Sequence, residues 1–355
     1  MSLTSSTLMT IDEIEALPIY FILAKGRSGT TLLQTILEAH PNTRAPVESR
    51  FLIHFKNRYH KTKKWTPQIR EAFFNDVLKE QKINLFWDID KEKLKYYLRL
   101  LPENSSYLLA CKMVYLSSGS MFIKGKTTCI IDKNPVYAWL TPLLLEVVPD
   151  AKFIHLIRDG RACVNSTIKF HTNRAKSVAK SWSTNNHYIE GFKNKKLENF
   201  HTLHYERLLN DPEKTMADIC QFLGIAFDPE MLNYHKTVDL SINAYLEGSS
   251  SDVSNNIRTM AYNKIHKNLS KPLDPSRINS WKESLTHAQI KYINKICQYC
   301  LERYGYIQKS NNNPSSPIYL SSMFTISKTQ LYYRLPIWVR ELKSKPTLVF
   351  LENEQ

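Results

Sequence analysis

The chain has 355 residues and an ordinary apolar share of 43%, which suits one large α/β domain or one such domain with additions. Lysines and arginines number 48 against 33 aspartates and glutamates, so the formal charge of +15 predicts anionic partners. The charge is spread along the chain and no RRM, KH or zinc-finger pattern occurs, which argues against a nucleic-acid-binding protein.

The cysteines and the first residues of the chain bear on where the protein works. The six cysteines lie scattered in mostly apolar contexts, as is typical of reduced, buried thiols. Cys297-x-x-Cys300 is a lone pair in a helical pattern, where packing is a commoner role than metal or redox chemistry. No signal-peptide pattern is present, and no run approaches the length of a membrane span. These features predict a cytoplasmic protein.

The first predicted strand, residues 19–24, is a short apolar run that leads into a glycine-flanked turn. A hydroxyl pair after the turn begins a helix that is expected to end near residues 40–42. A strand, a tight turn and a helix start form an anion site, because the first helical N–H groups lack partners and the helix dipole favours negative charge. The expected donors are Lys25, Gly26, Arg27, Ser28, Gly29, Thr30 and Thr31.

This turn differs from a Walker A loop, which needs a lysine after its second glycine. Here Gly29 is followed by Thr30, and the cation comes earlier, as Arg27. A nucleotide phosphate is still the expected ligand. Two other interpretations stay open at this point, a small-molecule kinase of the P-loop type and an ordinary strand-turn-helix with a solvated arginine.

Residues 43–55 are predicted to return as coil, with Glu48 on a proline-ordered stretch near the strand ends. Residues 66–101 are predicted to be helical, with aromatic residues interleaved with lysines. Such aromatics could line an acceptor cleft, although at helical spacing they more often belong to the core. A short strand is predicted at 107–114.

Clearer strands are predicted at 127–132, 152–157 and 200–205, and helical patterns alternate with them at 137–148, 162–170, 182–192 and 212–223. This alternation predicts a central parallel sheet flanked by helices, a three-layer α/β sandwich like that of P-loop NTPases. Ligands of such sheets bind at the carboxyl ends of the strands. The exit turns at 25–31, 132–135 and 158–161 are therefore expected to share one cleft, and all three carry cations.

A second phosphate-binding site is predicted at Arg158 and Ser166. Eight helical residues span about 12 Å, which is too far for one phosphate. Asp159-Gly160 should turn the chain first, however, so that a guanidinium and a hydroxyl converge on one anion. The simpler alternative pairs Arg158 with a carboxylate.

The end of the chain is predicted to be separate from the first 309 residues. A last helix is expected at 281–304, a polar linker begins at 310, and residues 310–355 form a basic, aromatic appendage. The appendage could lie peripherally on the inner membrane face, but packing on the domain or a loose tail is favoured because Pro336 and Pro346 interrupt its helical pattern.

Taken together, these motifs resemble those of sulfotransferases that use 3′-phosphoadenosine 5′-phosphosulfate (PAPS), in the Gly-Arg-Ser-Gly-Thr form. Residues 25–33 resemble the 5′-phosphosulfate loop of that family, and residues 157–162 with Ser166 resemble its 3′-phosphate element. The resemblance continues at 132–135, 205–209 and 271–272, and covers about residues 19–306. It implies a sulfotransferase domain at 1–309 that moves a sulfuryl group from PAPS, a co-substrate, to a hydroxyl or amine by in-line displacement without a metal.

The resemblance also implies roles for single residues. Arg27 and the loop would hold the 5′-phosphosulfate, and Arg158 with Ser166 the 3′-phosphate, with Lys271 as a weaker second cation. Arg27 and Lys133 would neutralise the leaving oxygen, and Glu48 would act as base. Charge environment alone leaves Glu48 open to a structural salt bridge with Arg44 or Arg50. The weaker candidate bases are His54, His155 and His171.

Two positions depart from the family pattern. Leu32 stands where cytosolic members have an aromatic residue that stacks on adenine, and Phe170 where tyrosylprotein-type members have an arginine. Trp182 and Tyr205 are the candidate stacking residues. The acceptor is expected to be a small molecule, carbohydrate or lipid. A P-loop-type kinase and a non-enzymatic basic membrane- or polyanion-binding protein remain the alternatives.

Overall fold

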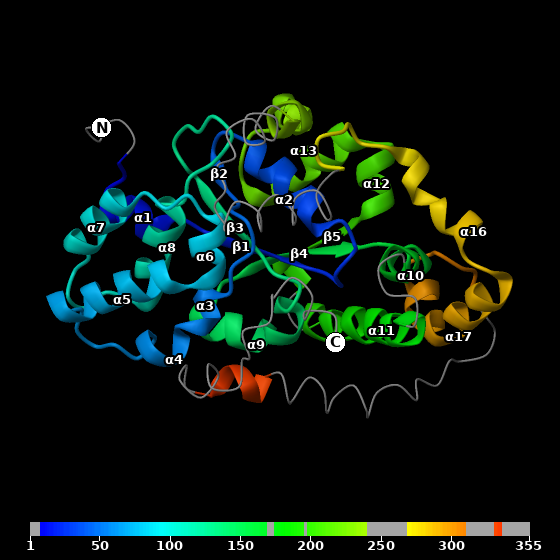
Figure 1. The fold of residues 1–355 in the computed structure, drawn as a ribbon, viewed down its shortest axis with the longest axis horizontal. Helices are drawn as coiled ribbons and strands as arrows, with labels where there is room; N and C mark the ends of the chain where they lie inside the picture. Colours follow the sequence, from blue (N-terminus) through cyan, green and yellow to red (C-terminus); the bar gives the residue numbers. More distant parts are fainter. Residues whose placement is uncertain (1–7, 169–173, 195–196, 240–267, 310–329, 336–355) are drawn as a thin grey trace, which may run out of the picture.

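The computed structural model describes residues 8–168, 174–194, 197–239, 268–309 and 330–335. At its centre is a five-stranded sheet in the order β2-β3-β1-β4-β5 (Figure 1). Each strand pairs in parallel with its neighbours, which confirms the α/β sandwich that the alternating pattern predicts. The strands are β1 (Ile19–Leu23), β2 (Thr43–Arg44), β3 (Cys129–Lys133), β4 (Lys152–Ile157) and β5 (Phe200–His204).

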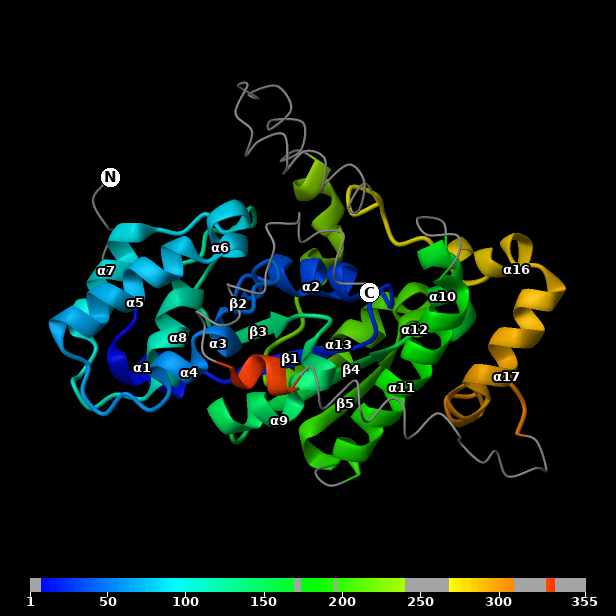
Figure 2. The same ribbon diagram turned by 60° about the horizontal axis from the view of Figure 1, so that its bottom comes forward.

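The central strand β1 supplies both faces of the sheet, because successive strand side chains point to opposite sides. Phe21 and Leu23 join one buried cluster, and Tyr20 and Ile22 join another. Figures 1 and 2 show α2 (Thr30–Ala39), α12 (Tyr205–Asn210) and α13 (Pro212–Leu223) on one face, with α9 (Tyr137–Val147) and α11 (Ala175–Lys193) on the other. Every residue of β1 is buried, as expected for a strand covered on both faces.

Two groups of helices extend the sheet at its ends (Figure 1). On the side of α11 lie α10 (Gly160–Ile168), α16 (Ser280–Ser284) and α17 (His287–Arg303), which share a third buried cluster with it. Short 3-10 turns are formed by Leu197–Asn199, Pro229–Asn233 and Pro275–Ile278. On the side of β2 lie α1 (Ile11–Ala16), α3 (Phe51–His54), α4 (Lys56–Tyr59), α5 (Pro67–Lys79), α6 (Gln81–Phe86), α7 (Lys91–Leu100) and α8 (Tyr107–Leu116).

The short strand predicted at 107–114 is wrong, because these residues form the helix α8. The hydroxyl of Ser106 caps this helix by accepting from the N–H of Leu109 at 3.1 Å. From Tyr107 to Leu116 every residue except Leu108 is buried. A helix buried all round shows no apolar periodicity, so its pattern cannot be told from that of a buried strand.

Three smaller differences concern where elements begin and end. Thr43 and Arg44, predicted to be coil, form the edge strand β2. The helical stretch 66–101 is divided into α5, α6 and α7, with Glu80 as the shared cap of the first two. The last helix is divided between α16 and α17 by the capping box at Thr286.

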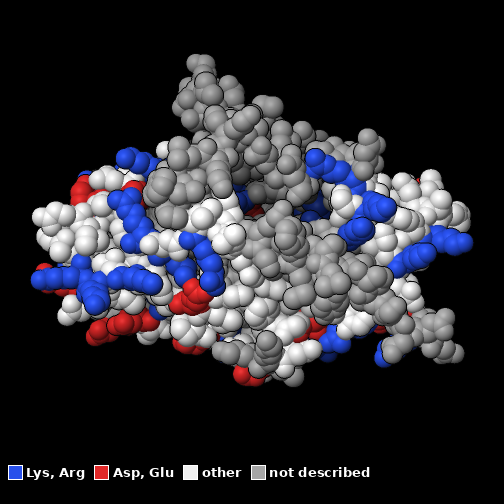
Figure 3. All heavy atoms as spheres, turned by 90° about the horizontal axis from the view of Figure 1, so that it is seen from below, with Lys and Arg blue, Asp and Glu red and all other residues white. Residues whose placement is uncertain are grey.

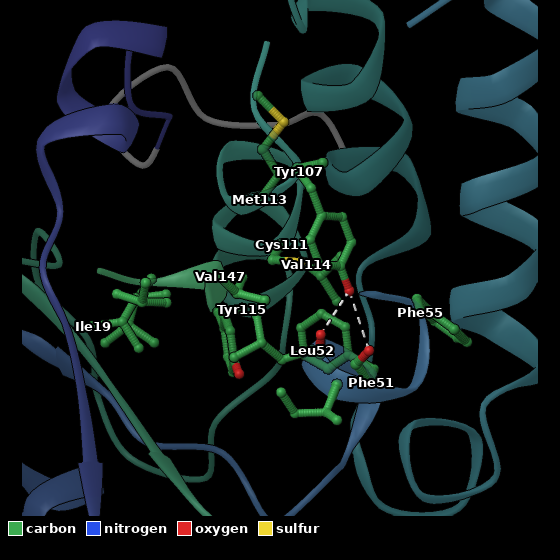
Figure 4. Close-up of a cluster of buried hydrophobic side chains, with 14 of the residues drawn as sticks. Ile19, Phe51, Leu52, Phe55, Tyr107, Cys111, Met113, Val114, Tyr115 and Val147 are labelled. Carbon is green, nitrogen blue, oxygen red and sulfur yellow. Dashed lines mark hydrogen bonds between the residues drawn. The ribbon is translucent and has the colours of Figure 1, made fainter. Parts of the chain in front are cut away.

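Buried tyrosines tie the helical group to the sheet. The hydroxyl of Tyr107 donates to the carbonyl oxygens of Phe51 and Leu52 at 3.3 and 3.0 Å (Figure 4). These bonds fix α3 against α8, and α3 follows directly on the segment that carries Glu48.

The surface agrees with a charge that is spread along the chain. Figure 3 shows basic side chains at both ends of the face that it displays, with acidic side chains between and beside them. Within the described residues, no helix combines the length and apolarity needed to cross a bilayer. All six cysteines are free and buried, as the sequence predicts.

The described part of the C-terminal appendage packs on the domain. Tyr333 is 4% exposed, its hydroxyl accepts from Arg50 Nη1 at 2.7 Å, and its ring stacks on His54 at 5.7 Å between centroids. Asn57 of α4 donates to the carbonyl of Tyr333, and Arg334 pairs with Glu146 of α9. Figure 2 shows this turn beside α4 and α9.

These contacts predict different effects for two neighbouring residues. Tyr333→Ala removes a buried ring and a hydrogen bond, so the free energy of unfolding should fall by about 2–4 kcal/mol. Leu331→Ala, at a position that is 62% exposed, should change it by less than about 0.5 kcal/mol. Urea unfolding of both variants measures the difference, and an equal effect would show that the turn does not depend on Tyr333.

Candidate active site

The glycine-flanked loop leaves β1 and adopts two left-handed residues before α2. Arg27 has a φ of 72° and Gly29 a φ of 94°, and the N–H of Ser28 donates to the carbonyl of Lys25 at 3.2 Å. Gly29 is the N-cap of α2 and supplies no side-chain cap. The first N–H groups of the helix are therefore available to an external anion. Thr30 and Thr31 form the first positions of this helix, as predicted.

Tyr205 explains why the second glycine is needed. A Cβ atom at position 29 would lie 2.4 Å from Cδ2 of the Tyr205 ring, and the positive φ also disfavours any side chain. Tyr205 is buried, and the guanidinium carbon of Arg158 lies 4.4 Å from its ring centroid. One face of the ring is thus occupied by Arg158, so Tyr205 supports the loop and the arginine. Its proposed stacking on adenine stays a prediction.

The two predicted phosphate-binding sites, the loop 25–31 and the pair Arg158 and Ser166, are in contact. Arg158 Nη1 donates to the carbonyl of Arg27 at 3.1 Å, and Arg27 Nε donates to Ser166 Oγ at the same distance. Cys163 of α10 also lies beneath the loop, with its sulfur 3.5 Å from the hydroxyl of Ser28. Because β1 and β4 are hydrogen-bonded neighbours, their exit turns meet at one end of the sheet, as the sequence predicts.

The turn that carries Arg158 is held by hydrogen bonds and packing from Trp182 and Glu206. Trp182 donates to the carbonyl of Arg158 at 3.0 Å, and its buried ring would lie 3.0 Å from a Cβ at Gly160. This packing makes Trp182 a support of the turn, and an adenine contact for it stays a prediction. The N–H of Asp159 donates to Glu206 at 3.0 Å, and the hydroxyl of Tyr306 donates to the same carboxylate at 2.8 Å. A fixed backbone holds the guanidinium of Arg158 in place.

Glu48 lies between two buried lysines. Lys133, at the end of β3, donates to Glu48 Oε2 at 2.9 Å, and Lys82 of α6 donates to Oε1 at 2.6 Å. These lysines take the place of Arg44 and Arg50, the partners that the sequence suggested. Lys133 also donates to Thr31 Oγ1 at 3.4 Å, so it connects the loop with the carboxylate.

The two lysines determine the charge of Glu48. Burial acts to raise the pKa of this carboxyl, but the charges of Lys133 and Lys82 outweigh it and hold the pKa well below its ordinary value. Burial lowers the pKa of Lys82, and the charge of Glu48 counters that shift. Glu48 is therefore ionised at neutral pH and remains so into the acid range.

A buried network lies behind Lys133. Asp132 accepts from the hydroxyls of Tyr115 and Tyr137 at 2.6 and 2.7 Å, and Tyr137 also donates to the carbonyl of Ser49 at 3.2 Å. Burial raises the pKa of Asp132 to about 6, although the two tyrosines favour its ionised form. The network joins the exit of β3 to the segment that carries Glu48.

The remaining candidates lie in different settings. Lys271 is exposed, its carbonyl accepts from Tyr234 at 3.2 Å, and its ammonium makes no hydrogen bond or ion pair with another described residue. His155 is a buried core histidine bonded to Asn186, and burial lowers its pKa to about 4. His54 is stacked on Tyr333. His171 and Phe170 lie outside the described residues.

The sequence did not identify Lys82 as part of the site. It is separated from Glu48 by 34 positions and lies in the stretch where lysines and aromatic residues alternate. No local pattern marks this one lysine among its neighbours. Among the described residues, no cluster of three or more His, Cys, Asp or Glu side chains is arranged to hold a metal ion.

A family model described as "Sulfotransferase family" matches residues 18–229. A putative protein-tyrosine sulfotransferase of Caenorhabditis briggsae is 25% identical over 249 residues, which cover 68% of this chain and 78% of that protein. The protein-tyrosine sulfotransferase of Drosophila melanogaster is 24% identical over 63% of this chain, and the match spans only 41% of that protein's length.

Among solved structures, the sulfotransferase domain of the Synechococcus PCC 7002 olefin synthase superimposes with a TM-score of 0.51 at 22% identity, covering 82% of this chain and 96% of that domain. This likeness shows that the fold is shared. Because the family model spans more than half of the chain, and because it includes the loop, Glu48, Lys133 and Arg158, the protein belongs to the sulfotransferase family of enzymes.

Proposed function

We propose that this sulfotransferase uses PAPS as its donor and transfers the sulfuryl group to a hydroxyl. The observation that supports the donor most strongly is the contact of Arg158 and Ser166 with the phosphate-binding loop. A nucleotide with anionic groups on both its 3′ and 5′ positions matches two cationic grips on neighbouring strand exits. Arg158 Nε is also buried without a hydrogen-bond partner among the described residues, which suits a second anion there.

The residues divide the work as follows. The loop 25–31 and the first turn of α2 bind the 5′-phosphosulfate, and Arg158 with Ser166 binds the 3′-phosphate. Sulfur bonds to the acceptor oxygen while its bond to the bridging oxygen breaks, so 3′,5′-bisphosphoadenosine leaves and the acceptor proton moves to Glu48. Arg27 and Lys133 neutralise the charge that develops on the leaving oxygen.

The acceptor is proposed to be a phenolic hydroxyl. Lys82 and Lys133 lower the pKa of Glu48, which makes this carboxylate a weak base. A phenol, whose ordinary pKa is about 10, gives up its proton far more readily than a sugar or alkyl hydroxyl. The names of the C. briggsae and Drosophila relatives point to the same chemistry, since both refer to protein tyrosine. A tyrosine side chain is therefore favoured over the carbohydrate and lipid acceptors expected from the sequence.

Nucleotide binding tests the donor. Thermal-shift measurements should show strong stabilisation by 3′,5′-bisphosphoadenosine and little by ADP or ATP. Arg158→Ala should weaken binding of the bisphosphate by about 10- to 100-fold, the worth of one charge-assisted hydrogen bond, with little change for its 3′-dephosphorylated analogue. Equal losses for both nucleotides would reject the role of Arg158, and equal stabilisation by ATP would reject PAPS as donor.

Replacing the base should separate binding from transfer. Glu48→Gln keeps the size of the side chain but cannot accept the proton, so the transfer rate to a phenol should fall by about 10²- to 10⁴-fold. Affinity for the bisphosphate should stay within about threefold, because the described contacts of Glu48 are with Lys82 and Lys133. His54→Ala serves as the control for an alternative base. Turnover that persists in Glu48→Gln and is lost in His54→Ala would move the base to His54.

The two loop glycines should differ in their tolerance of a side chain. Gly29→Ala has to displace the Tyr205 ring and hold alanine at positive φ. The free energy of unfolding should therefore fall by at least about 1 kcal/mol. Gly26→Ala is the matched control, because no atom of the residues that the structure describes lies within 4 Å of a Cβ placed there. Urea unfolding measures both, and similar stabilities would mean that the loop relaxes around residue 29.

A further inference from the structure

One short segment holds three consecutive residues of the loop that carries the proposed base. Trp87 Nε1 donates to the carbonyl of Val47 at 2.6 Å. Lys82 Nζ donates to the carboxylate of Glu48 at 2.6 Å, and Ser49 Oγ donates to Glu80 Oε2 at 3.1 Å. The segment 80–87 consists of α6 with its two capping residues.

Both ends of this segment also make contacts that do not involve the loop. At its start, the carboxylate of Glu80 accepts from the N–H of Ile83 at 2.7 Å, which caps α6. At its end, the ring of Trp87 packs against Tyr115 of α8 with 5.7 Å between centroids. Lys82 therefore leaves a rigid helix that is held at both ends, and its side chain is 10% exposed.

The close pairing of Lys82 with the Glu48 carboxylate is not explained by a gain in the free energy of unfolding. Two ions taken out of water lose hydration, and their attraction often does no more than offset that loss. A pair of apolar side chains would fill the same space at no such cost. The pair is better explained by what it does to Glu48, whose two oxygens are held by lysines from two different elements.

The two lysines are not equivalent. Lys133 touches both Glu48 and Thr31 of the phosphate-binding loop, whereas among the described residues the ammonium of Lys82 hydrogen-bonds to Glu48. The oxygen held by Lys133 is thus on the side of the loop, and the oxygen held by Lys82 is on the side of α6. A change at Lys82 can alter the carboxylate without touching the loop.

We propose that the segment 80–87 is the positioning element for Glu48, and that Lys82 is a positioning residue that fixes one carboxylate oxygen so that the other stays next to Lys133 and the loop. This inference rests on the proposed role of Glu48 as the acceptor's base. It assigns a role in catalysis to helix α6, which the family motifs do not include.

The charged groups around Glu48 and Lys82 determine in which direction the pKa of Glu48 should move when Lys82 is replaced. Lys133 and Lys82 face Glu48, Arg50 and Lys133 act on Lys82, and the charge of Lys82 acts on Glu80. His54 lies 4.0 Å from Glu80. Removing the charge of Lys82 leaves a partly buried carboxylate with one cation in place of two, so the pKa of Glu48 should rise and the base should be protonated at a higher pH.

The experiment compares Lys82→Met with Lys79→Met, an exposed lysine on α5. In Lys82→Met, the acidic limb of the kcat/KM profile for a phenolic acceptor should move up by about 1–3 pH units, and kcat at neutral pH should fall with KM for the donor unchanged. Lys79→Met should leave both as in the wild type. Lys82→Arg should restore most of the acidic limb, because it returns a cation near the same oxygen.

A second readout does not depend on turnover. Selective carbon-13 labelling of glutamate side chains allows the carboxyl signal of Glu48, assigned with Glu48→Gln, to be titrated in the wild type and in Lys82→Met. An upward shift of that titration supports the inference even if the enzyme uses another donor. Lys82→Gln replaces the methionine variant if the latter does not fold.

The outcomes separate this inference from the function on which it rests. Transfer to no hydroxyl by the wild type would reject the proposed function, and the titration would still decide whether Lys82 controls Glu48. An unmoved titration and an unmoved acidic limb in Lys82→Met would overturn the inference. So would equal losses in Lys82→Met and Lys79→Met.

Discussion

The guanidinium of Arg158 connects the exits of two neighbouring strands, and the geometry of the site depends on that connection. It donates to the carbonyl of Arg27 at 3.1 Å and lies over Tyr205, the ring that also presses against Gly29. Since β1 and β4 are paired, the separation of the two turns is fixed by the sheet. The proposed donor carries two anionic groups, and their spacing is expected to match that separation.

The same end of the sheet shows how burial and charge compete. At Asp132, burial prevails and raises the pKa, although two tyrosine hydroxyls favour the ionised form. At Glu48, two lysines prevail over burial and keep the carboxylate charged. The charge of Lys133 acts on both acidic groups, so one lysine has a protonation-sensitive neighbour in Asp132 and a partner in Glu48 whose ionised form it favours.

Much of the fold could be predicted because its signals are local. Strand runs, the glycine pair and the helix starts each occupy a few residues, so the parallel sheet and the meeting of Arg158 with the loop followed from them. The helix α8 was missed because burial on all sides removes the periodicity that marks a helix. Lys82 was missed for another reason, since its bond to Glu48 crosses 34 positions and exists only after α6 has packed. Tyr205 packs against the loop and Trp182 against the Arg158 turn, and a contact of either ring with adenine stays a prediction.

The segment from Val47 to Leu52 has an unusual density of support for a stretch with little regular structure. Side chains from separate parts of the chain donate to its carbonyl groups: Trp87 to Val47, Tyr137 to Ser49, and Tyr107 to Phe51 and Leu52. Carbonyl groups that are buried in such a stretch need partners, because each one without a partner would cost free energy. The proposed base needs them for a second reason, since proton transfer requires atoms placed within a fraction of an ångström. The hydrogen bonds that satisfy the backbone therefore also position Glu48. For this reason a change in helix α6 is expected to affect the proposed proton transfer.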